Sequence, residues 1–193
     1  MATKVNFSAE ERQLMQNAAV ILTKNAIIQK IYELFGNCTT AFKQALDAVN
    51  QNNLIYRASP KISRGENYEG LPWVALDFIR IYEKQDILAV RALFWWGNFI
   101  SLSILIKGIY LEQYGKAVTK QLATSNNEWL LCLADNPWEH HLRNDIVLHS
   151  NTDKINEHDF IKITTKIPLQ EWDNFGNILA ERFTEIISGM MKA

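Results

Sequence analysis

Two residues of opposite charge, Asp77 and Arg91, stand in stretches that are otherwise suited to burial. If these stretches are neighbouring antiparallel strands joined by a loop at residues 83–85, the two side chains face each other and pair. The pair is then either structural, with its carboxylate held ionised, or a polar anchor at the base of a ligand cavity. A slip of one residue sends the side chains to opposite faces of the sheet, so the sequence leaves both outcomes open.

Two serines extend this question to the next stretch. Ser101 and Ser103 alternate with Ile100, Leu102 and Ile104, so a strand here has one apolar face and one mixed face. The mixed face is the better cavity wall, because small-molecule sites combine apolar surface with a few polar groups. Both serines are therefore candidate ligand-binding residues.

The segment Arg64-Gly65-Glu66-Asn67-Tyr68 gathers charged, amide and aromatic side chains around a glycine. We interpret it as a turn between two strands. Such a loop can hold an anionic ligand through Arg64, with Glu66, Asn67 and Tyr68 beside it. The alternative is a hairpin turn whose charged side chains are only solvated.

Aromatic residues are dense between positions 73 and 99. The set comprises Trp73, Phe94, Trp95, Trp96 and Phe99. Their rings can stack on a planar ligand, and they can equally fill a core or a subunit interface. The adjacent Trp95 and Trp96 point to opposite sides of an extended strand, so one of them is free to line a pocket or a subunit contact. Trp73 and Trp95 join the ligand-binding candidates.

Histidines provide the remaining candidates for chemistry. His140 and His141 follow Glu139, and imidazole beside a carboxylate can transfer protons near neutral pH. The adjacent pair lacks the helical spacing of zinc-protease ligands, and His149 and His158 do not supply it. We predict no metal site and keep His140 and His141 as acid–base candidates.

Common catalytic signatures are missing from the sequence. It contains no Gly-x-Ser-x-Gly nucleophile motif, no phosphate-binding loop ending in Lys-Ser or Lys-Thr, and no Gly-x-Gly-x-x-Gly fingerprint. The cofactor and the biochemical activity are therefore unknown from sequence.

The stretches that hold these candidates mainly predict strands. Period-two alternation and dense β-branched and aromatic residues predict a central meander, whose last hairpin turns at Gly97-Asn98. The final strand alternates isoleucines with lysines and threonines, which indicates one wet face and a place near the sheet edge. The strands are expected at residues 73–78, 87–96, 99–107, 129–134 and 160–167.

Helices are expected at both ends of the chain. Ser8 and Glu11 have the spacing of a capping box, and the helix that they begin should end at Gly36-Asn37. With a second helix at residues 40–52 it would form an N-terminal helical hairpin. Another helix is predicted at residues 110–124, and a C-terminal helix follows Pro168. This order favours an α+β fold, in which the hairpin and the C-terminal helix pack on an antiparallel sheet of about five to six strands.

Composition limits the class of protein. The 193 residues carry a net charge of −1 and are 48% hydrophobic, which fits a single α+β domain over residues 1–193. The charge disfavours dedicated nucleic-acid binding, and the uncharged run at residues 92–106 is shorter than the roughly 20 residues of a membrane span. Two distant cysteines, Cys38 and Cys132, and a start without a signal-peptide pattern favour the cytoplasm.

The run KISRGENYEGLPWVALDF at residues 61–78, with FWWGN at 94–98, resembles a family of uncharacterised bacterial proteins. The resemblance implies a bacterial cytosolic protein and brings no activity, cofactor or catalytic residue. From the residues, the leading hypothesis is a ligand-binding or accessory protein with a small-molecule pocket against the sheet. The alternatives are a small enzyme with a histidine–carboxylate acid–base pair, and a homo-oligomeric scaffold joined through the tryptophan-rich hairpin.

Overall fold

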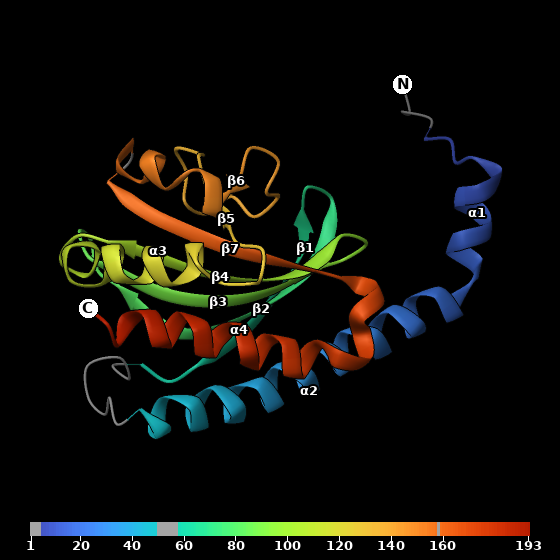
Figure 1. Ribbon diagram of the computed structural model, residues 1–193. Coiled ribbons are helices and arrows are strands. Elements are labelled where there is room, and N and C mark those ends of the chain that lie inside the picture. The colour runs from blue at the N-terminus through green and yellow to red at the C-terminus, as the bar shows by residue number, and fades with distance from the viewer. Residues whose placement is uncertain (1–4, 50–57, 158) are drawn as a thin grey trace.

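The protein is built on one antiparallel sheet with its long helices on one face (Figure 1). The computed structural model describes residues 5–49, 58–157 and 159–193, and within them seven strands lie in the order β1-β2-β3-β4-β7-β5-β6. Their bounds are Lys61–Tyr68 (β1), Leu71–Tyr82 (β2), Ile87–Trp95 (β3), Phe99–Lys107 (β4), Leu130–Leu131 (β5), Ile146–Val147 (β6) and Phe160–Pro168 (β7). The predicted α+β class is confirmed. The strand count exceeds five to six because the sequence pattern predicts a turn over most of β1 and because β6, with two residues, is too short to show a period.

Four α-helices are described in these parts of the chain. They are α1 (Ala9–Gln16), α2 (Ala18–Ala48), α3 (Lys116–Ala123) and α4 (Phe175–Met190). A π turn at Leu111–Gly115 leads into α3, and a 3₁₀ turn at Leu169–Asn174 leads into α4. The helices α2 and α4 run side by side against the sheet, and α3 packs beside α4 (Figure 1).

The predicted capping box at the start of α1 is confirmed. Ser8 Oγ accepts from the Glu11 backbone N–H at 3.1 Å, and the Ser8 N–H donates to Glu11 Oε2 at 2.6 Å. The break between the N-terminal helices lies at Asn17, whose Oδ1 accepts from the Ala19 N–H at 3.1 Å. Since α1 buries no residue, only α2 packs on the sheet.

The predicted helix end at Gly36-Asn37 is wrong, because α2 continues through both residues. One buried stripe stays in helical phase across the glycine, at Ile28, Ile31, Phe35, Cys38, Phe42 and Leu46. Burying that stripe outweighs the roughly 1 kcal/mol that a glycine costs inside a helix. One long helix therefore replaces the expected hairpin, and its predicted end at residue 52 lies outside the described residues.

The predicted turn at Arg64-Gly65-Glu66-Asn67 is also wrong, because these residues belong to β1. The chain reverses at Glu69-Gly70, with φ of 51° and 81°, as in the two-residue turns that suit strand twist. Gly65 has a different purpose: a Cβ there would lie 2.5 Å from Trp73 Nε1. The glycine lets the indole lie across β1.

A β-bulge at Phe78 sets the register of β2 against β3. The predicted pairing of Asp77 with Arg91 is present. The loop after β2 is one residue longer than expected, because Tyr82 pairs with Ile87. That extra residue alone would put Asp77 and Arg91 on opposite faces, and the bulge shifts the register back by one.

The extra residue of the bulge points into the core between the sheet and the helices. Phe78 meets Phe42 of α2 and Phe183 of α4 edge-on, with ring centroids 5.3 and 5.1 Å away. The two helix rings stack on each other at 4.1 Å. Such aromatic pairs add stabilisation beyond the burial of their area, so the bulge is fixed by the core.

The hairpin of β3 and β4 turns where the sequence predicts, at Gly97 with φ 70°. It contains the uncharged run at residues 92–106. No helix in the described parts of the chain has the length and apolar character needed to cross a membrane.

The predicted place of the last strand near the sheet edge is wrong, because β7 lies between β4 and β5. Lys162, on the face expected to be wet, is 2% exposed. The segment between β5 and β6 covers that face, and Lys162 Nζ donates to the Glu139 carbonyl within it. A distant segment, which strand periodicity does not reveal, therefore buries the lysine.

Replacing Gly36 by alanine is expected to raise the free energy of unfolding by about 0.5–1 kcal/mol. The position is helical, and a Cβ there would meet no atom within 4 Å. Urea denaturation followed by circular dichroism measures the change. The control is Gly70→Ala, which should destabilise because φ there is +81°. If Gly36→Ala destabilised the protein as well, a helix break at this glycine would be indicated instead.

Candidate functional site

The outer face of the sheet, opposite α2 and α4, carries an ion pair between Asp77 and Arg91. Arg91 Nε donates to Asp77 Oδ1 at 2.6 Å and Nη2 donates to Oδ2 at 3.1 Å. Tyr82 Oη also donates to Asp77 Oδ1, at 3.1 Å. This two-point geometry is the strong form of an arginine–carboxylate contact.

The surroundings stabilise the protonated forms of both partners of Asp77. Burial, reinforced by the charge of Asp77, raises the pKa of Tyr82 to about 12. Burial alone would lower the pKa of Arg91, but the hydrogen bonds and charge of Asp77 outweigh it and raise that pKa. Near neutral pH, Tyr82 is thus a hydroxyl donor and Arg91 a cation.

A cavity of about 230 Å³ opens beside Arg91. Its walls come from three strands and from the segment between β5 and β6. The lining residues are Asn67 and Tyr68 of β1, Trp73 of β2, Arg91 and Leu93 of β3, and Trp138 and His140 of that segment. The ring of Trp138 lies 5.6 Å from the Arg91 guanidinium carbon, as in a cation–π contact.

His140 is held as a neutral imidazole. Burial, with the nearby positive charges of Lys162 and Arg91, lowers the pKa of His140 to about 3. Its Nε2 lies 3.2 Å from Arg91 Nη1, which can only donate, so Nε2 accepts and the ring proton is on Nδ1. The backbone N–H of His140 donates to Tyr68 Oη at 2.7 Å.

The cavity walls offer hydrogen-bond donors. Tyr68 Oη accepts from His140, and burial raises the pKa of Tyr68, so its own O–H proton remains to donate. Asn67 Oδ1 accepts from the Gly70 N–H at 3.1 Å, which leaves the NH₂ group for a ligand. No described residue accepts from either of these donors or from His140 Nδ1. The site therefore suits a molecule rich in acceptors.

Polar contacts underneath hold the segment between β5 and β6 in place. Besides donating to Glu139, Lys162 lies near Asp145; burial lowers the pKa of the lysine and raises that of the aspartate. Further along the same segment, Arg143 forms an ion pair with Glu69 of the β1–β2 turn. These contacts tie the wall that bears Trp138 and His140 to the sheet.

Six residues proposed from the sequence meet in this region. They are Asn67, Tyr68, Trp73, Asp77, Arg91 and His140. Five of the six line the cavity, and Asp77 orients Arg91 from the neighbouring strand. The two groups that the sequence suggested for different purposes, the ligand candidates and His140, thus share one site.

Two other candidates do not reach the cavity. Arg64 is exposed on β1, and Glu66 forms an ion pair with Lys24 of α2. The reason is the misplaced turn: in a strand, Arg64 and Glu66 share one face. A register shift between Gly65 and Tyr68 then lets the adjacent Asn67 and Tyr68 both line the cavity.

The remaining candidates lie around the site. Trp95 packs behind Tyr68 at a centroid distance of 5.2 Å, and its Nε1 donates to the Tyr68 carbonyl. Ser103 donates to the Arg91 carbonyl at 3.4 Å, and Ser101 is buried beyond the cavity lining. His141 lies 3.2 Å from Glu139, within its own segment.

Sequence reasoning missed Leu93, Trp138 and Lys162. The first two line the cavity, and Lys162 supports its loop wall. Trp138 follows Asn136-Pro137, a turn signal that placed it in a loop without indicating that the loop folds back over the sheet. The alternation in β7 did put Lys162 on one face with Thr164, and that face proves to be the covered one.

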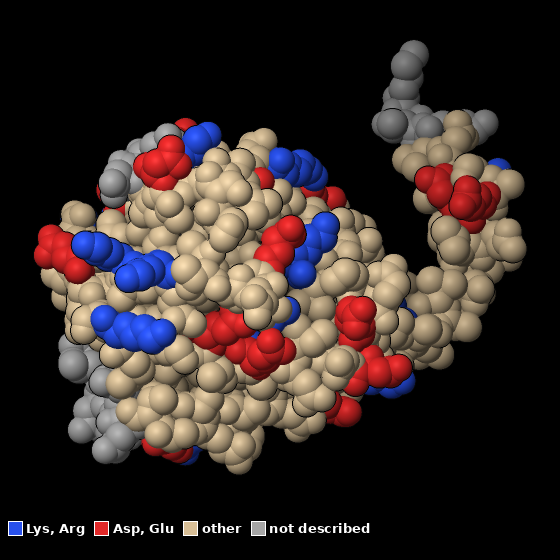
Figure 2. All heavy atoms as spheres, viewed as in Figure 1, with Lys and Arg blue, Asp and Glu red and all other residues tan. Residues whose placement is uncertain are grey.

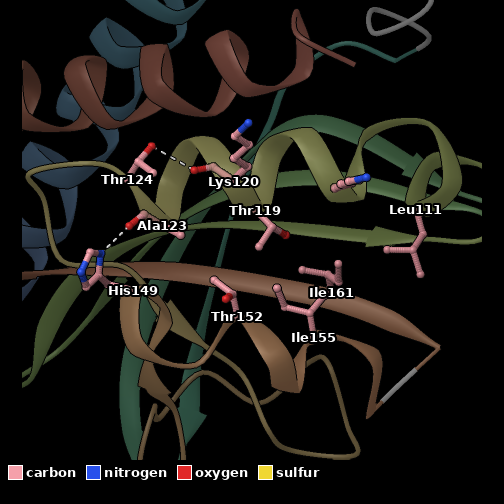
Figure 3. A pocket seen from close by; sticks show the side chains of 10 residues that line it. Leu111, Thr119, Lys120, Ala123, Thr124, His149, Thr152, Ile155 and Ile161 are labelled. Carbon is pink, nitrogen blue, oxygen red and sulfur yellow. Dashed lines mark hydrogen bonds between the residues drawn. The ribbon is translucent and has the colours of Figure 1, made fainter.

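A larger cavity of about 660 Å³ lies between α3 and the segment at residues 149–155 (Figure 3). Thr119 is buried there and its Oγ1 has no hydrogen-bond partner in the described residues. His149 Nδ1 donates to the Ala123 carbonyl at 2.7 Å, and the Lys120 amine extends away from Ile155 and Ile161 (Figure 3). Of these two cavities we favour the smaller as the candidate functional site, because its walls bring the ion-paired Arg91 together with the donor groups of Tyr68 and His140.

Neither similarity to known proteins nor a set of metal ligands indicates a function for this chain. Comparison with family models, curated proteins and solved structures finds no match to this chain. In the described parts of the chain, no group of three or more His, Cys, Asp and Glu side chains is arranged to hold a metal ion. The resemblance of residues 61–78 and 94–98 to uncharacterised bacterial proteins stays a prediction.

Removing one member of the ion pair is expected to destabilise the protein strongly. Asp77→Ala should lower the free energy of unfolding by about 3 kcal/mol, because it leaves the largely buried Arg91 without its carboxylate. The double variant, Asp77→Ala with Arg91→Met, should lose less free energy of unfolding than the two single variants lose together. Urea denaturation of all four proteins measures this coupling. Strictly additive losses would show that the two side chains do not stabilise each other.

His140 should make stability depend on pH. Between about pH 6.5 and about pH 3 the unfolded chain binds a proton at this histidine and the folded protein does not. Stability therefore falls as pH is lowered through this window, by up to about 1.4 kcal/mol per pH unit. In His140→Gln the contribution disappears, so the stability advantage of the wild type should shrink as the medium is acidified.

Urea denaturation at neutral and mildly acidic pH measures that difference. His149→Gln, the same substitution at an exposed histidine, is the control. A constant gap between the wild type and His140→Gln at every pH would contradict a neutral, buried His140.

Proposed function

We propose that the protein binds a small, flat, acceptor-rich molecule in the 230 Å³ cavity beside Arg91. The observation that carries this proposal is the set of donors on the cavity walls, from Asn67, Tyr68 and His140, that no described residue satisfies. Trp73 and Trp138 supply aromatic surface around them. Few polar groups in a largely apolar, concave site are the usual form of a small-molecule site.

The size of the cavity supports a ligand of one or two fused rings. Drug-sized ligands occupy about 300–1,000 Å³, more than this cavity offers. At about 30 Å³ per water molecule, the cavity corresponds to about seven or eight waters. A single substituted aromatic ring or an indole-sized molecule fits this volume.

The charges support a neutral or singly charged ligand. Asp77 already neutralises Arg91 through two hydrogen bonds, so the guanidinium offers a ligand little uncompensated charge. A phosphate dianion would need further cations. One carboxylate or carbonyl group, accepting from Asn67, Tyr68 and the His140 Nδ1–H, suits the site.

The same geometry favours binding over proton transfer. A general acid or base is most effective with a pKa near the working pH, whereas that of His140 is about 3. At neutral pH the imidazole is a fixed hydrogen-bond donor rather than a proton shuttle.

We also propose a cytoplasmic location, which the two free, buried cysteines Cys38 and Cys132 support.

A panel of benzoate, nicotinate and indole-3-carboxylate, with their carboxamides, tests the proposal. At least one compound should raise the melting temperature in a saturable way and change tryptophan fluorescence, because Trp73 and Trp138 line the cavity. Asn67→Asp keeps the oxygen that accepts from the Gly70 N–H but replaces the donor with a negative charge. It should weaken carboxylate binding by about tenfold or more.

Asn126→Asp is the matched control, since it makes the same charge change at an exposed site distant from the cavity lining. It should leave the affinity unchanged. The proposal fails if no compound in the panel shifts the melting temperature, or if both aspartate variants weaken binding equally.

A further inference from the structure

The N-terminal arm, residues 5–27, leaves the body of the protein (Figure 1). α1 buries no residue, and the first buried residue of α2 is Ile28. At 1.5 Å per residue, the first ten residues of α2 extend about 15 Å before that point. The arm therefore makes almost no contact with its own sheet.

The side chains of this arm are unusually apolar for an exposed segment. Thirteen large hydrophobic side chains are exposed among the described residues, and seven of them lie here: Val5, Phe7, Leu14, Met15, Val20, Ile21 and Leu22. In Figure 2 the surface of the arm is largely uncharged, with acidic side chains gathered on α1, and exposed apolar residues clustered in one segment mark an interaction site.

The beginning of α2 is apolar around its whole circumference. Residues 18–22 read Ala-Ala-Val-Ile-Leu, more than one helical turn without a polar side chain. A helix that is apolar on every side is normally buried, and a short helix without packing is marginal in water. The arm thus has the composition of a buried helix.

An apolar groove of about 450 Å³ lies at the base of the arm. It is lined by Ile27, Lys30, Phe94, Trp96, Gly97, Leu169 and Trp172. Trp172 is 39% exposed, which is high for a tryptophan in an apolar depression. The groove includes part of the tryptophan-rich hairpin, for which the sequence left a core, a pocket wall and a subunit contact open.

We propose that the groove receives the arm of a second copy of this chain, so that two copies exchange arms around a two-fold axis. The arm cannot fill its own groove, because α2 is continuous and carries it away (Figure 1). An ion pair between Lys24 and Glu66 of β1 favours this direction weakly. One chain thus presents both an apolar arm and an apolar groove, as a self-complementary interface requires.

We place the two-fold axis at Ile21, which determines which residues of the two arms face each other. Two antiparallel copies of α2 then bring residue 18 of one copy opposite residue 24 of the other. Residue 17 then lies opposite residue 25 of the partner, so α2 itself brings the arm to within two residues of Ile27 in the groove lining, and α1 bends away from the α2 axis at that point (Figure 1). The arm is long enough to reach the groove.

Charge and area agree with this occupant. Lys30 is the one charged residue of the described groove lining, and the first turn of α1 carries Glu10 and Glu11. The seven arm side chains are 43–72% exposed, so burying the remainder of about 60–120 Å² each removes about 240–480 Å² of apolar area per protomer. Trp96 and Trp172 of the groove add to this area, and the exchange of two arms doubles the total, which places the interface at the small end of specific contacts.

Light scattering of the full chain after gel filtration tests the proposal. The expected mass is twice 22.3 kDa. Ile21→Glu should halve that mass without changing the circular dichroism spectrum, because residue 21 is outside the protomer core. Ile109→Glu is the matched control and should remain dimeric, since both isoleucines are 56% exposed.

A cross-link tests the position of the axis. Ile21→Cys should form a disulfide between copies on mild oxidation, because the two copies of residue 21 meet at the axis, whereas Ile109→Cys should not. A monomeric wild type, or a dimer that tolerates Ile21→Glu, overturns the proposal. A monomer whose arm instead binds vesicles of anionic phospholipid overturns it in favour of a membrane surface.

Discussion

The bulge at Phe78 is the constraint on which both sides of the sheet depend. On the helix side it places an aromatic ring between Phe42 and Phe183. On the outer side it brings Asp77 opposite Arg91 despite a loop that is one residue longer than a three-residue connection. Removing the bulge would therefore disturb the core and separate the ion pair in one step. Bulges next to functional sites commonly aim side chains in this way.

The ion pair in turn decides the chemistry of the cavity. Because Asp77 takes two of the Arg91 donors, Nη1 remains for His140 Nε2, and the histidine must carry its proton on Nδ1. The charges of Arg91 and Lys162 add to burial in keeping that imidazole neutral. A carboxylate outside the cavity lining thus fixes the tautomer of a histidine inside it. Asp77, Arg91 and His140 form one hydrogen-bonded network, in which each contact limits the orientation of the next side chain.

Local patterns predicted the elements of this fold better than their connections. Alternation located the meander, and the pairing of Asp77 with Arg91 was foreseen, although through a loop length that is wrong and without the bulge that compensates it. Gly36 looked like a helix end because its own propensity is visible in sequence, whereas the packing that overrides it is not. The covering of Lys162 could not be predicted, since it depends on a segment more than twenty residues away.

Strand β1 connects the proposed ligand cavity with the base of the N-terminal arm. Its Glu66 forms an ion pair with Lys24 at the base of the arm, while Asn67 and Tyr68 line the cavity. The ion pair is exposed on the Glu66 side and contributes at most about 1 kcal/mol, so it directs the arm rather than holding it. The hydrophobic surface of the arm must then supply the free energy for its packing, because the contacts within one chain are too few. The cavity, by contrast, is built from one chain, so ligand binding does not require a second copy.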